Sequence, residues 1–498
     1  MTSGTYDTGT YDTGTYVTGT YDMAVVGAGP AGLAAAITAA AAGRAVALVD
    51  AGPRPGGQYF RHRAADPGRR PRLDGVTYLP GHRVWQVEPG FVVHALAGTG
   101  GTAGTGGAGG ADERPVEIRA AMLVLAPGAY DRSLPFPGWD LPGVLTAGAA
   151  QALVKGSGVA AGARTVVAGT GPFLLPVATE LAATGSTVAG VFEANRPYGF
   201  AAALARQPAR LAEGARYTAA LGRARIPYLM GRAVVAAHGD GAHGDGAVTA
   251  VTVARLDDDW HPVGGTERTI ECDSVAVGYG FTPQLELPLQ LGCATEVAAD
   301  GNLVVVVDAA QRTSVPGVYA AGEVTGIGGA QLAMVEGELA AHAAHAALGH
   351  GAPLASKRVR GLLARRRRLR DFAAALRAAY AVRPGWTSWL RDDTLICRCE
   401  EVPYARLAAA VGLGATEPRA VKLLSRAGMG WCQGRVCGYP TAMITAAATG
   451  RPPGAAELRS LARRPIAQPI RLGDLAGGAD PADPAGFASG ELRKRGRV

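Results

Sequence analysis

Short runs of Val, Ala and Leu alternate along this chain with longer segments rich in Ala and Leu. The short runs include "AVALVD", "AMLVLAP", "RTVVAGTG" and "STVAGVFEA". A continuous apolar run of roughly four to eight residues is typical of a strand buried on both faces, whereas the longer segments have the length of helices. This alternation predicts an α/β fold with parallel sheets and crossover helices.

Three stretches of low complexity interrupt the pattern. Residues 1–21 repeat "GTYDT" with a period of five, and we expect a disordered tail there. Gly98 to Gly110 holds eight glycines in 13 residues, and "HGDGA" is doubled from His238. Holding eight glycines in regular structure would cost about 4–8 kcal/mol relative to alanine. We therefore expect both stretches to be surface loops between hairpin strands.

The composition is that of a globular protein of about three domains, with 498 residues, 48% of them hydrophobic and 18% charged. The 21 residues from Met23 to Gly43 carry no charge, but three aspartates and no basic residue precede them. Glycine and proline also interrupt this segment, so we predict neither a transmembrane segment nor a signal sequence. Six cysteines are too few for a disulfide scaffold, which favours the cytoplasm.

Eight basic residues lie between Lys357 and Arg370, as many as the whole net charge of +8. Apolar residues follow the same segment at helical spacing, so we expect a linker helix with an apolar stripe and a solvated basic face. No aromatic residues are interleaved with the basic ones and no nucleic-acid-binding motif is present, so nucleic acid is not the expected partner. Another protein or an acidic electron carrier fits better. The stripe is Val359, Leu362, Leu363, Leu369, Phe372 and Leu376.

The segment "YDMAVVGAGPAGLAAAI" predicts a dinucleotide-binding turn between a strand and a helix. Gly27 permits the tight turn, Gly29 leaves room for a pyrophosphate, and Gly32 lets the helix pack closely on the strand. The phosphates would then lie at the positive end of the helix. Asp50 ends the next strand and can accept a hydrogen bond from a ribose hydroxyl. The candidate residues are Gly27, Gly29, Pro30, Ala31, Gly32 and Asp50.

A distant segment, "SVPGVYAAGEVTGIGGAQLAMVEGELAA", resembles the second flavin-binding motif of flavoproteins with two dinucleotide-binding domains. The resemblance implies that FAD is the nucleotide and that Glu323, where Asp is usual, holds its ribityl chain. The helix that follows can direct its N-terminus at the flavin ring. "PGGQ" and "LVLAPGAYDR" also resemble loops that line the flavin, although Pro127 stands where Thr is usual. The resemblance adds Gly57, Gln58, Gly128, Gly322, Glu323 and Gln331 to the candidate cofactor-binding residues.

A second unit of nucleotide-binding type, "RTVVAGTGPFLLPVATEL", lies between the two flavin segments. It has Gly169 and Gly171, but Leu174 occupies the third glycine position and is expected to push helix and strand apart. The acid after its next strand is Glu193, which would repel the 2′-phosphate of NADP. NAD, another adenine nucleotide, or a purely structural unit without ligand remain open.

Four of the six cysteines lie in two close pairs, in "LICRCEEV" and "GMGWCQGRVCGYP". Zinc sites with four cysteines more often use Cys-x2-Cys pairs than the Cys-x-Cys and Cys-x4-Cys found here. We predict a [2Fe–2S] cluster, with zinc or unliganded buried thiols as alternatives. Arg398 and Arg435 would balance the negative charge of the cluster. The candidate metal ligands are Cys397, Cys399, Cys432 and Cys437.

Short helices are expected around these cysteines. Two lie between the pairs, in "PYARLAAAVGLG" and "TEPRAVKLLSRAGMG", and each is expected to end at a glycine. Thr416 would cap the second, with Pro418 in its first turn. "YPTAMITAAATG" predicts a third helix whose N-terminus faces the cluster. Cys272 and Cys293 stand alone and are expected to be ordinary core residues.

Long motifs carry a wider resemblance over nearly the whole chain after residue 22. "GAYDRSLPFPGWDLPGVLTAGAAQALVK", "AAGEVTGIGGAQLA", "CRCEEV" and "GMGWCQGRVCG" resemble the large flavin-containing subunits of opine oxidase, hydrogen cyanide synthase and the hydroxyproline or proline dehydrogenases. The C-terminal part is similar to [2Fe–2S] domains of the bacterioferritin-associated-ferredoxin type. The resemblance implies two nested dinucleotide-binding domains, as in glutathione and thioredoxin reductases, and a small helical [2Fe–2S] domain.

These patterns divide the chain as follows: a tail, 1–21; a discontinuous FAD-binding domain, 22–150 and 275–350; a second nucleotide-binding-type domain, 151–274; a basic linker helix region, 351–392; the [2Fe–2S] domain, 393–452; and a C-terminal tail, 453–498.

The resemblance implies an FAD- and [2Fe–2S]-containing electron-transfer subunit of a heteromeric dehydrogenase. The substrate would be an amino acid or amine of the opine, hydroxyproline, glycine or sarcosine type, oxidised at its CH–NH bond by a partner of the D-amino-acid-oxidase type. A small ferredoxin-like subunit, FMN at a subunit interface and a downstream electron acceptor are further candidates. A flavin takes up two electrons and can release them singly, which suits a one-electron cluster.

Three other functions compete with this one. A free-standing NADH-dependent reductase would use the second nucleotide-binding unit, but Leu174 weakens that case. A disulfide reductase would need a close cysteine pair beside the flavin, and no such pair precedes residue 390. A scaffold without cofactors conflicts with the complete cysteine set. No acid/base or nucleophile constellation is evident, so no catalytic residue is assigned.

Overall fold

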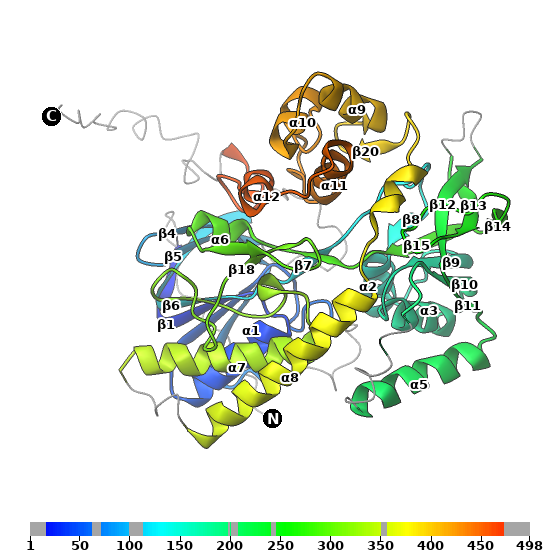
Figure 1. The fold of residues 1–498 in the computed structure, drawn as a ribbon. Helices are drawn as coiled ribbons and strands as arrows, with labels where there is room; N and C mark the ends of the chain where they lie inside the picture. The colour runs from blue at the N-terminus through cyan, green and yellow to red at the C-terminus, as the bar shows by residue number, and fades with distance from the viewer. Residues whose placement is uncertain are drawn as a thin grey trace.

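The fold was analysed in a computed structural model, which describes residues 16–61, 71–98, 113–197, 200, 208–240, 246–349 and 356–472. Two α/β units lie side by side, and a helical C-terminal part lies across them (Figure 1). This arrangement confirms the predicted α/β class. No helix within the described ranges is both long and apolar enough to cross a bilayer.

The first unit is built on a seven-stranded sheet in which β1, β2, β3, β6 and β19 run parallel. The antiparallel strands β4 and β5 extend it beyond β6. Helices α1 (Pro30–Ala41) and α7 (Ala330–Ala347) pack together beside this sheet. The strands are β1 (Tyr16–Val26), β2 (Val46–Asp50), β3 (Val76–Pro80), β4 (His82–Glu88), β5 (Val92–Gly98), β6 (Glu113–Leu125) and β19 (Val318–Ala320).

Strand β1 begins inside the N-terminal repeat. Its backbone pairs with β6 from Tyr16 opposite Val116 to Val26 opposite Leu125. The expectation of a disordered tail is therefore wrong for residues 16–21, because pairing with a neighbouring strand supplies backbone hydrogen bonds that the repeat composition did not indicate. Residues 1–15 lie outside the described part of the chain.

Both glycine-rich stretches are flanked by hairpin strands, as predicted. Strand β5 pairs antiparallel with β6 on either side of residues 99–112, and β12 (Arg232–Gly239) pairs antiparallel with β13 (Val248–Arg255) on either side of 241–245. The loops themselves lie outside the described residues.

The second unit has a five-stranded sheet in the order β11-β10-β9-β15-β8. Its strands are parallel, and α2 (Ala147–Ser157), α3 (Leu174–Ala183) and α5 (Pro208–Arg223) belong to the same unit. Strand β8 comes from the segment 22–150, so this sheet draws on chain that precedes residue 151. The strands are β8 (Val144–Thr146), β9 (Arg164–Gly169), β10 (Thr187–Glu193), β11 (Tyr228–Met230) and β15 (Ser274–Gly278).

Strand β14 (Arg268–Glu271) pairs with β13 and completes a three-stranded antiparallel sheet with β12. The remaining short elements are β7 (Ala129–Asp131), β16 (Phe281–Pro283), α6 (Glu286–Gln290), β17 (Thr295–Val297), β18 (Leu303–Val305) and η3 (Glu323–Thr325). Strand β7 pairs with β16, so the two crossings between the units run next to each other.

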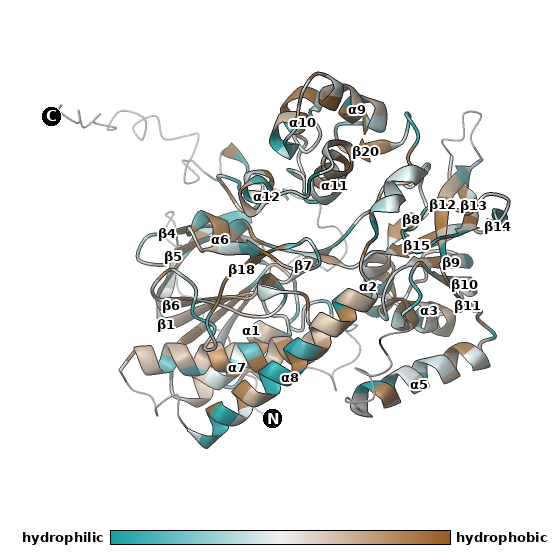
Figure 2. Ribbon diagram, viewed as in Figure 1, coloured by the Kyte–Doolittle hydropathy of each residue, from teal (hydrophilic) through white to brown (hydrophobic). Residues whose placement is uncertain are grey.

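Helix α8 (Lys357–Ala379) is the predicted linker helix. Its buried residues are Val359, Leu362, Leu369 and Ala373, and Figure 2 shows most of its hydrophilic residues in the first half of the helix. Ser356 caps the helix, because its hydroxyl accepts a hydrogen bond from Val359 N at 3.3 Å.

The C-terminal part holds the four clustered cysteines. It consists of η4 (Pro384–Trp389), β20 (Leu395–Cys397), β21 (Val402–Pro403), α9 (Tyr404–Gly412), α10 (Pro418–Ser425), α11 (Gly438–Thr449) and α12 (Ala455–Ala462). We call residues 393–450 the cysteine domain. Helix α12 and the packed residue Ala467 show that the expected C-terminal tail is structured as far as residue 472; Ala467 N donates to Trp85 O at 2.7 Å.

Two details of α10 differ from expectation. Its N-cap is Glu417 rather than Thr416, with no side-chain cap, although Pro418 does open the first turn. The helix ends at Arg426, which adopts a φ of +68°, rather than at a glycine. Arg426 Nη2 bonds Glu400 Oε2 at 2.9 Å, a tertiary contact that helps to hold this backbone conformation.

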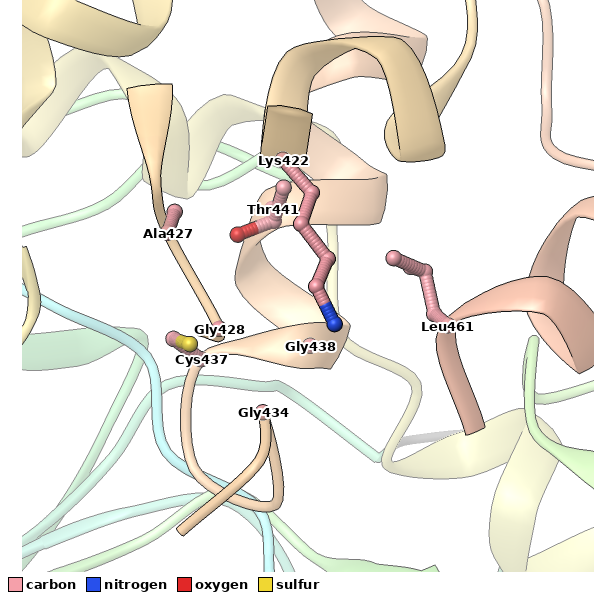
Figure 3. Close-up of a pocket in the computed structure, with 8 residues that line it drawn as sticks. All are labelled: Lys422, Ala427, Gly428, Gly434, Cys437, Gly438, Thr441 and Leu461. Carbon is pink, nitrogen blue, oxygen red and sulfur yellow. The ribbon is translucent and has the colours of Figure 1, made fainter. Parts of the chain in front are cut away.

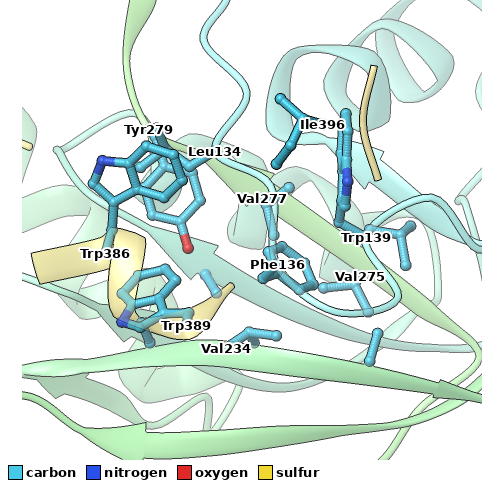
Figure 4. Close-up of a cluster of buried hydrophobic side chains, with 14 of the residues drawn as sticks. Leu134, Phe136, Trp139, Val234, Val275, Val277, Tyr279, Trp386, Trp389 and Ile396 are labelled. Atoms are coloured by element: carbon cyan, nitrogen blue, oxygen red, sulfur yellow. The ribbon is translucent and has the colours of Figure 1, made fainter. Parts of the chain in front are cut away.

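One buried core runs without a break from the second unit into the cysteine domain (Figure 4). Trp139 and Val275 belong to it on one side, and Trp389 and Ile396 on the other. Trp389 stacks on Trp260 with ring centroids 6.1 Å apart, and its indole N–H donates to Trp260 O at 2.9 Å. Within the cysteine domain itself, Ile396 lies in this core and Leu395 O accepts a hydrogen bond from the indole N–H of Trp139 at 2.5 Å, so the domain packs directly on the second unit.

Candidate functional site

The first glycine turn has the close packing that a dinucleotide requires. Gly27 has a φ of +101°, and a Cβ there would overlap the carbonyl oxygen of Ala126. A Cβ on Gly32 would overlap Gly27 O, so only glycine allows α1 to approach the turn. Gly29 has open space around its missing side chain, next to Pro30 and Ala31 in the first turn of α1.

Asp50 lies at the end of β2 beside this turn. Its carboxylate accepts hydrogen bonds from Ala28 N at 2.5 Å and from Gly52 N at 2.7 Å. Burial raises the pKa of Asp50, which these two bonds partly oppose. Asp50 is only partly buried, at the end of β2.

The remaining flavin-loop candidates come to the same edge of the sheet. Gly57 packs on the glycine turn, since a Cβ there would lie 2.9 Å from Gly29 Cα. The backbone around Ala126 follows β6 past Gly27 to Gly128, which has a φ of +87° and open space around it. Gln58 is exposed.

Glu323 follows β19 at this edge. Its carboxylate accepts a hydrogen bond from Gly329 N at 2.9 Å, across the turn that leads into α7. Desolvation by the surrounding protein raises the pKa of Glu323 to about 7. Gly322 has a φ of +80° and approaches Ala31 of α1, while Gln331 lies in the first turn of α7.

Sequence reasoning missed Glu336, a fully buried carboxylate on α7. It accepts hydrogen bonds from Gly322 N and Thr325 Oγ1, both at 3.0 Å, and pairs with Arg370 of α8 at 2.7 Å. Part of the basic segment thus fixes the turn that carries Glu323. An acid on an otherwise apolar helix face was the available signal, because buried carboxylates are rare unless they are paired.

The acid beside the second glycine turn, Glu193, is more deeply buried than Asp50 beside the first. Glu193 is fully buried, and its carboxylate accepts from Gly171 N at 2.8 Å and Asn195 N at 2.9 Å. Burial raises its pKa to about 7. The expected separation of helix and strand by Leu174 is relieved by Gly278 on β15, where a Cβ would lie 3.2 Å from Leu174 Cδ2. A Cβ on Gly169, as on Gly27, would overlap a neighbouring backbone carbonyl.

The chain that leaves α8 crosses the end of this second turn. Asn195 Nδ2 donates to Thr170 Oγ1 at 2.7 Å and to Ala381 O at 3.0 Å. Thr170 Oγ1 also contacts Tyr380 O at 3.5 Å. Ligands of such sheets bind beyond the carboxyl ends of the strands, so residues 380–381 lie where a nucleotide would bind.

The structure brings all four predicted cysteine ligands together. The Sγ atoms of Cys397 and Cys399 are 3.8 Å apart, and those of Cys399 and Cys432 are 3.7 Å apart. Cys437 donates to the Cys397 sulfur, and this hydrogen bond lowers the pKa of Cys397. A tetrahedral metal with bonds to sulfur of about 2.3 Å separates its sulfurs by about 3.8 Å. The measured distances match that separation, but among the residues that the structure describes no group of three or more His, Cys, Asp or Glu side chains is arranged so that it could hold a metal ion.

Glycine residues pack closely against the sulfurs. A Cβ on Gly430 would overlap Cys399 Sγ, and Gly428, with a φ of +81°, donates its N–H to Cys397 Sγ at 3.4 Å. Helix α11 begins directly after Cys437, so its N-terminus faces the sulfurs as predicted. The residues present fit a thiolate-held iron–sulfur or zinc centre.

The two arginines expected to balance the cluster are directed elsewhere. Arg398 lies over the Trp139 ring, 5.0 Å from its centroid, and donates to Asp140 O. Arg435 reaches the candidate metal ligand Cys432 at its backbone oxygen, 3.1 Å away. The reason is that both side chains fix the cysteine domain onto the segment 129–140.

Arg435 takes part in a buried network that sequence reasoning missed. Its Nε lies 2.9 Å from both Glu286 Oε1 and Tyr130 Oη, and Arg464 Nη1 is 3.3 Å from the same Glu286 oxygen. Tyr130 follows the flavin-loop candidate Gly128 by two residues. The network therefore joins the predicted flavin loop to the loop between Cys432 and Cys437.

Lys422 of α10 is a cation close to the buried sulfurs (Figure 3). It lines a small cavity together with Gly428, Cys437 and Leu461. Burial lowers its pKa, which the cysteines Cys437 and Cys397 partly oppose. In Figure 3 its side chain extends from α10 towards Gly438 and Leu461. The sequence places Lys422 ten residues before the second cysteine pair, with no local signal of this contact.

The isolated cysteines are ordinary core residues, as expected. Cys272 and Cys293 are buried in two different cores, and burial raises the pKa of each thiol. All six cysteines are free thiols.

The structure has two glycine turns on parallel sheets, each followed by an acid, and the segment around Gly322 and Glu323 lies beside the first turn. These features define a flavoprotein class of oxidoreductases with two dinucleotide-binding units. The chain belongs to the pyridine nucleotide-disulphide oxidoreductase family, whose model matches residues 21–347 and indicates FAD as the cofactor.

Comparison with known proteins narrows the relationship. The chain is 35% identical to the hydrogen cyanide synthase subunit HcnB of Pseudomonas aeruginosa, over 86% of this chain and 93% of the relative. It is 33% identical to an opine oxidase subunit of Agrobacterium tumefaciens, over 91% of this chain and 90% of the relative. Among solved structures, the L-proline dehydrogenase from P. horikoshii shares the fold, with a TM-score of 0.62 and 19% identity over 92% of this chain and 79% of that one.

Proposed function

We propose that this chain is the electron-transfer subunit of a heteromeric amino-acid or amine dehydrogenase and that it holds FAD and a [2Fe–2S] cluster. Its relatives of similar length are named as subunits of hydrogen cyanide synthase and opine oxidase, which supports a role within a complex. The expected partner is a flavoprotein subunit of the D-amino-acid-oxidase type that oxidises the CH–NH bond. A small ferredoxin-like subunit, FMN at the interface and a cytoplasmic location belong to the same proposal.

The convergence of the four cysteines carries the proposal. Cys399 and Cys432 are 33 residues apart in the chain, yet their sulfurs lie 3.7 Å apart, and Cys397 lies 3.8 Å from Cys399. Cys437 completes the set through its contact with the Cys397 sulfur. A thiolate cluster next to a flavin is suited to splitting a two-electron reduction into single-electron steps.

The residues of this chain would hold and orient the two groups. Gly29 and the N-terminus of α1 would receive the pyrophosphate, Asp50 a ribose hydroxyl and Glu323 the ribityl chain. Tyr130 and Arg435 keep the predicted flavin loop and the cysteine loop in a fixed relative position, which a transfer step between them requires. Because no proton has to be taken from an amine here, the absence of an acid/base constellation from the sequence fits this role.

The geometry does not favour the alternative of a free-standing NADH-dependent reductase. Glu193 is fully buried, whereas Asp50 is partly exposed, and Asn195 binds the chain at Ala381 across the end of the second turn. We infer that the second unit serves as a structural support and holds no NAD or other adenine nucleotide. Anaerobic mixing with NADH tests this: we expect the flavin absorbance to persist with NADH and to bleach with dithionite. Rapid bleaching by NADH would favour the reductase.

Metal and flavin analysis of the purified chain tests the main proposal. We expect one FAD and two iron and two sulfide ions per chain, with an electron paramagnetic resonance signal after reduction. Replacing Cys437→Ser should abolish the signal and most of the iron. Cys272→Ser is the matched control, because Cys272 is equally buried but lies in the second unit, and it should leave the iron content unchanged. Stoichiometric zinc with no sulfide would refute the cluster assignment.

A further inference from the structure

The chain offers a specific surface by which electrons could leave. We propose that the cleft between α10 and α12 is the docking site for an acidic, one-electron carrier protein. This inference rests on the proposed function, since it assumes a redox centre at the four cysteines.

The cleft itself is large enough to receive protruding side chains of a partner. Its volume is 330 Å³, and it is lined by Arg419, Lys422 and Leu423 of α10 and by Ser460 and Arg463 at the end of α12. Three of these five residues are cations, and none is an acid. Aspartate and glutamate side chains of a carrier are the groups that such a lining would receive.

The charge of the cleft is not neutralised by its own helices. Helix α10 has no acid within it, although its exposed N-cap is Glu417, and the one acid of α12, Glu457, already pairs with Arg451 at 2.6 Å and accepts from Gly454 N. Arg419 and Arg463 are exposed. Exposed charges of one sign act over about 10 Å at 0.1 M salt, so they can steer an oppositely charged protein to this face.

Apolar side chains accompany the cations. Leu423 is 61% exposed and Leu424 is 51% exposed, both on α10. Large aliphatic side chains in water next to basic residues are typical of a protein–protein contact, where the apolar groups are buried and the charges orient the partner. A free phosphate or nucleotide would make no use of these leucines.

The cleft leads directly to the cysteines. Lys422 lines the cleft on one side and, on the other, the small cavity that Cys437 and Leu461 also line (Figure 3). One side chain therefore separates a docked carrier from a candidate ligand. Close approach of this kind is what electron transfer between two proteins requires.

The basic helix α8 is the competing surface, and the structure assigns it a different role. Arg366, Arg370 and Arg377 are directed inward, to Glu336 and to Ile327 O. Figure 1 places the basic first half of α8 on the opposite side of the molecule from α10 and α12. A carrier bound there would be separated from the cysteines by the first unit.

The transfer changes no covalent bond. With a redox centre held by Cys397, Cys399, Cys432 and Cys437, one electron would pass to a ferric ion of the carrier's [2Fe–2S] cluster. The donor would be oxidised by one electron and the carrier reduced by one, with no proton required.

Charge reversal tests the site with a plant-type [2Fe–2S] ferredoxin as the acidic probe. The cleft variant is Arg419→Glu with Arg463→Glu, which leaves Lys422 intact. The matched control is Arg365→Glu with Arg367→Glu, two exposed arginines of α8 and the same change in charge. Binding of oxidised ferredoxin is titrated calorimetrically at low and high salt, and ferredoxin reduction is followed after photoreduction of the full chain.

We expect the cleft variant to weaken ferredoxin binding at least tenfold at low salt, with the difference shrinking at high salt. The control should bind like the parent chain. Equal weakening by both variants, weakening by the control alone, or no weakening would each overturn the docking site. Iron content and reduction of the parent chain are measured separately: a chain without iron refutes the proposed function, whereas the binding titration still decides whether the cleft binds the carrier.

Discussion

The buried network around Glu286 predicts a large and specific cost when its carboxylate is removed. The side chain of Glu286 is 6% exposed, and those of its partners Arg435 and Arg464 are 11% and 9% exposed. Removing one partner of such a buried ion pair leaves an uncompensated charge and costs about 3–5 kcal/mol. We therefore expect Glu286→Ala to loosen the attachment of the cysteine domain to the flavin loop by about this amount.

Amide hydrogen exchange of the loop 428–440 measures this opening directly. A loss of about 3 kcal/mol corresponds to exchange roughly 100-fold faster, if the loop exchanges through local opening. Glu286→Gln keeps the hydrogen-bond acceptor and should have a smaller effect. The matched control is Glu338→Ala, because Glu338 pairs at 3.1 Å with Arg358, whose side chain is 68% exposed.

The control should change stability by less than about 1 kcal/mol, as exposed pairs do. A double-mutant cycle of Glu286→Gln with Arg435→Gln should be clearly non-additive, because the two groups interact directly. If Glu286→Ala accelerated exchange no more than the control, the network would not hold the two loops together, and this reasoning would be refuted.

Two further predictions follow from single residues. The Gly29→Ala chain should fold normally, since nothing lies within 4 Å of the missing Cβ, but should lose most of its FAD. The Gly27→Ala chain should also have a lower melting temperature, because its Cβ would overlap a backbone carbonyl. Measuring flavin content together with calorimetric melting separates the two effects. The pKa of Glu193 is raised by burial to about 7, so the folded chain binds more protons than the unfolded chain between about pH 4.5 and 7 and loses stability as the pH rises through that range. Glu193→Gln should remove on the order of 3 kcal/mol of this pH dependence of the unfolding free energy. Urea titrations measure that free energy at pH 5 and pH 8, and an equal change between the two pH values in both chains would contradict the prediction.

The sequence was sufficient for the features that are local in the chain. The turn at Gly27 needs its glycines within six residues, and the helix after Cys437 follows from its composition alone. The fold class followed from the alternation of apolar runs and helical segments. The spacing of the four cysteines also predicted that they meet, which the sulfur distances support.

Contacts between distant segments could not be predicted in this way. Arg435 was expected to face the cluster, but it pairs with Glu286, which lies 149 residues earlier in the chain. The tail repeat was expected to be disordered because its composition is polar, yet pairing with β6 gives residues 16–21 a place in the sheet. In both cases contacts with distant segments overrode a local preference, and the local sequence gave no indication of those contacts.

The continuous core beneath the cysteine domain has a consequence for protein engineering. A ferredoxin-like module can be excised or transplanted only if its own side chains cover its interior. Here Ile396 and Val402 of the cysteine domain share one core with Trp139 and Trp260 of the preceding unit. Expression of residues 393–450 alone would leave those apolar faces in water, and we expect an insoluble fragment. A transplant of the cysteine domain would have to bring the segments that carry Trp139 and Trp260 with it.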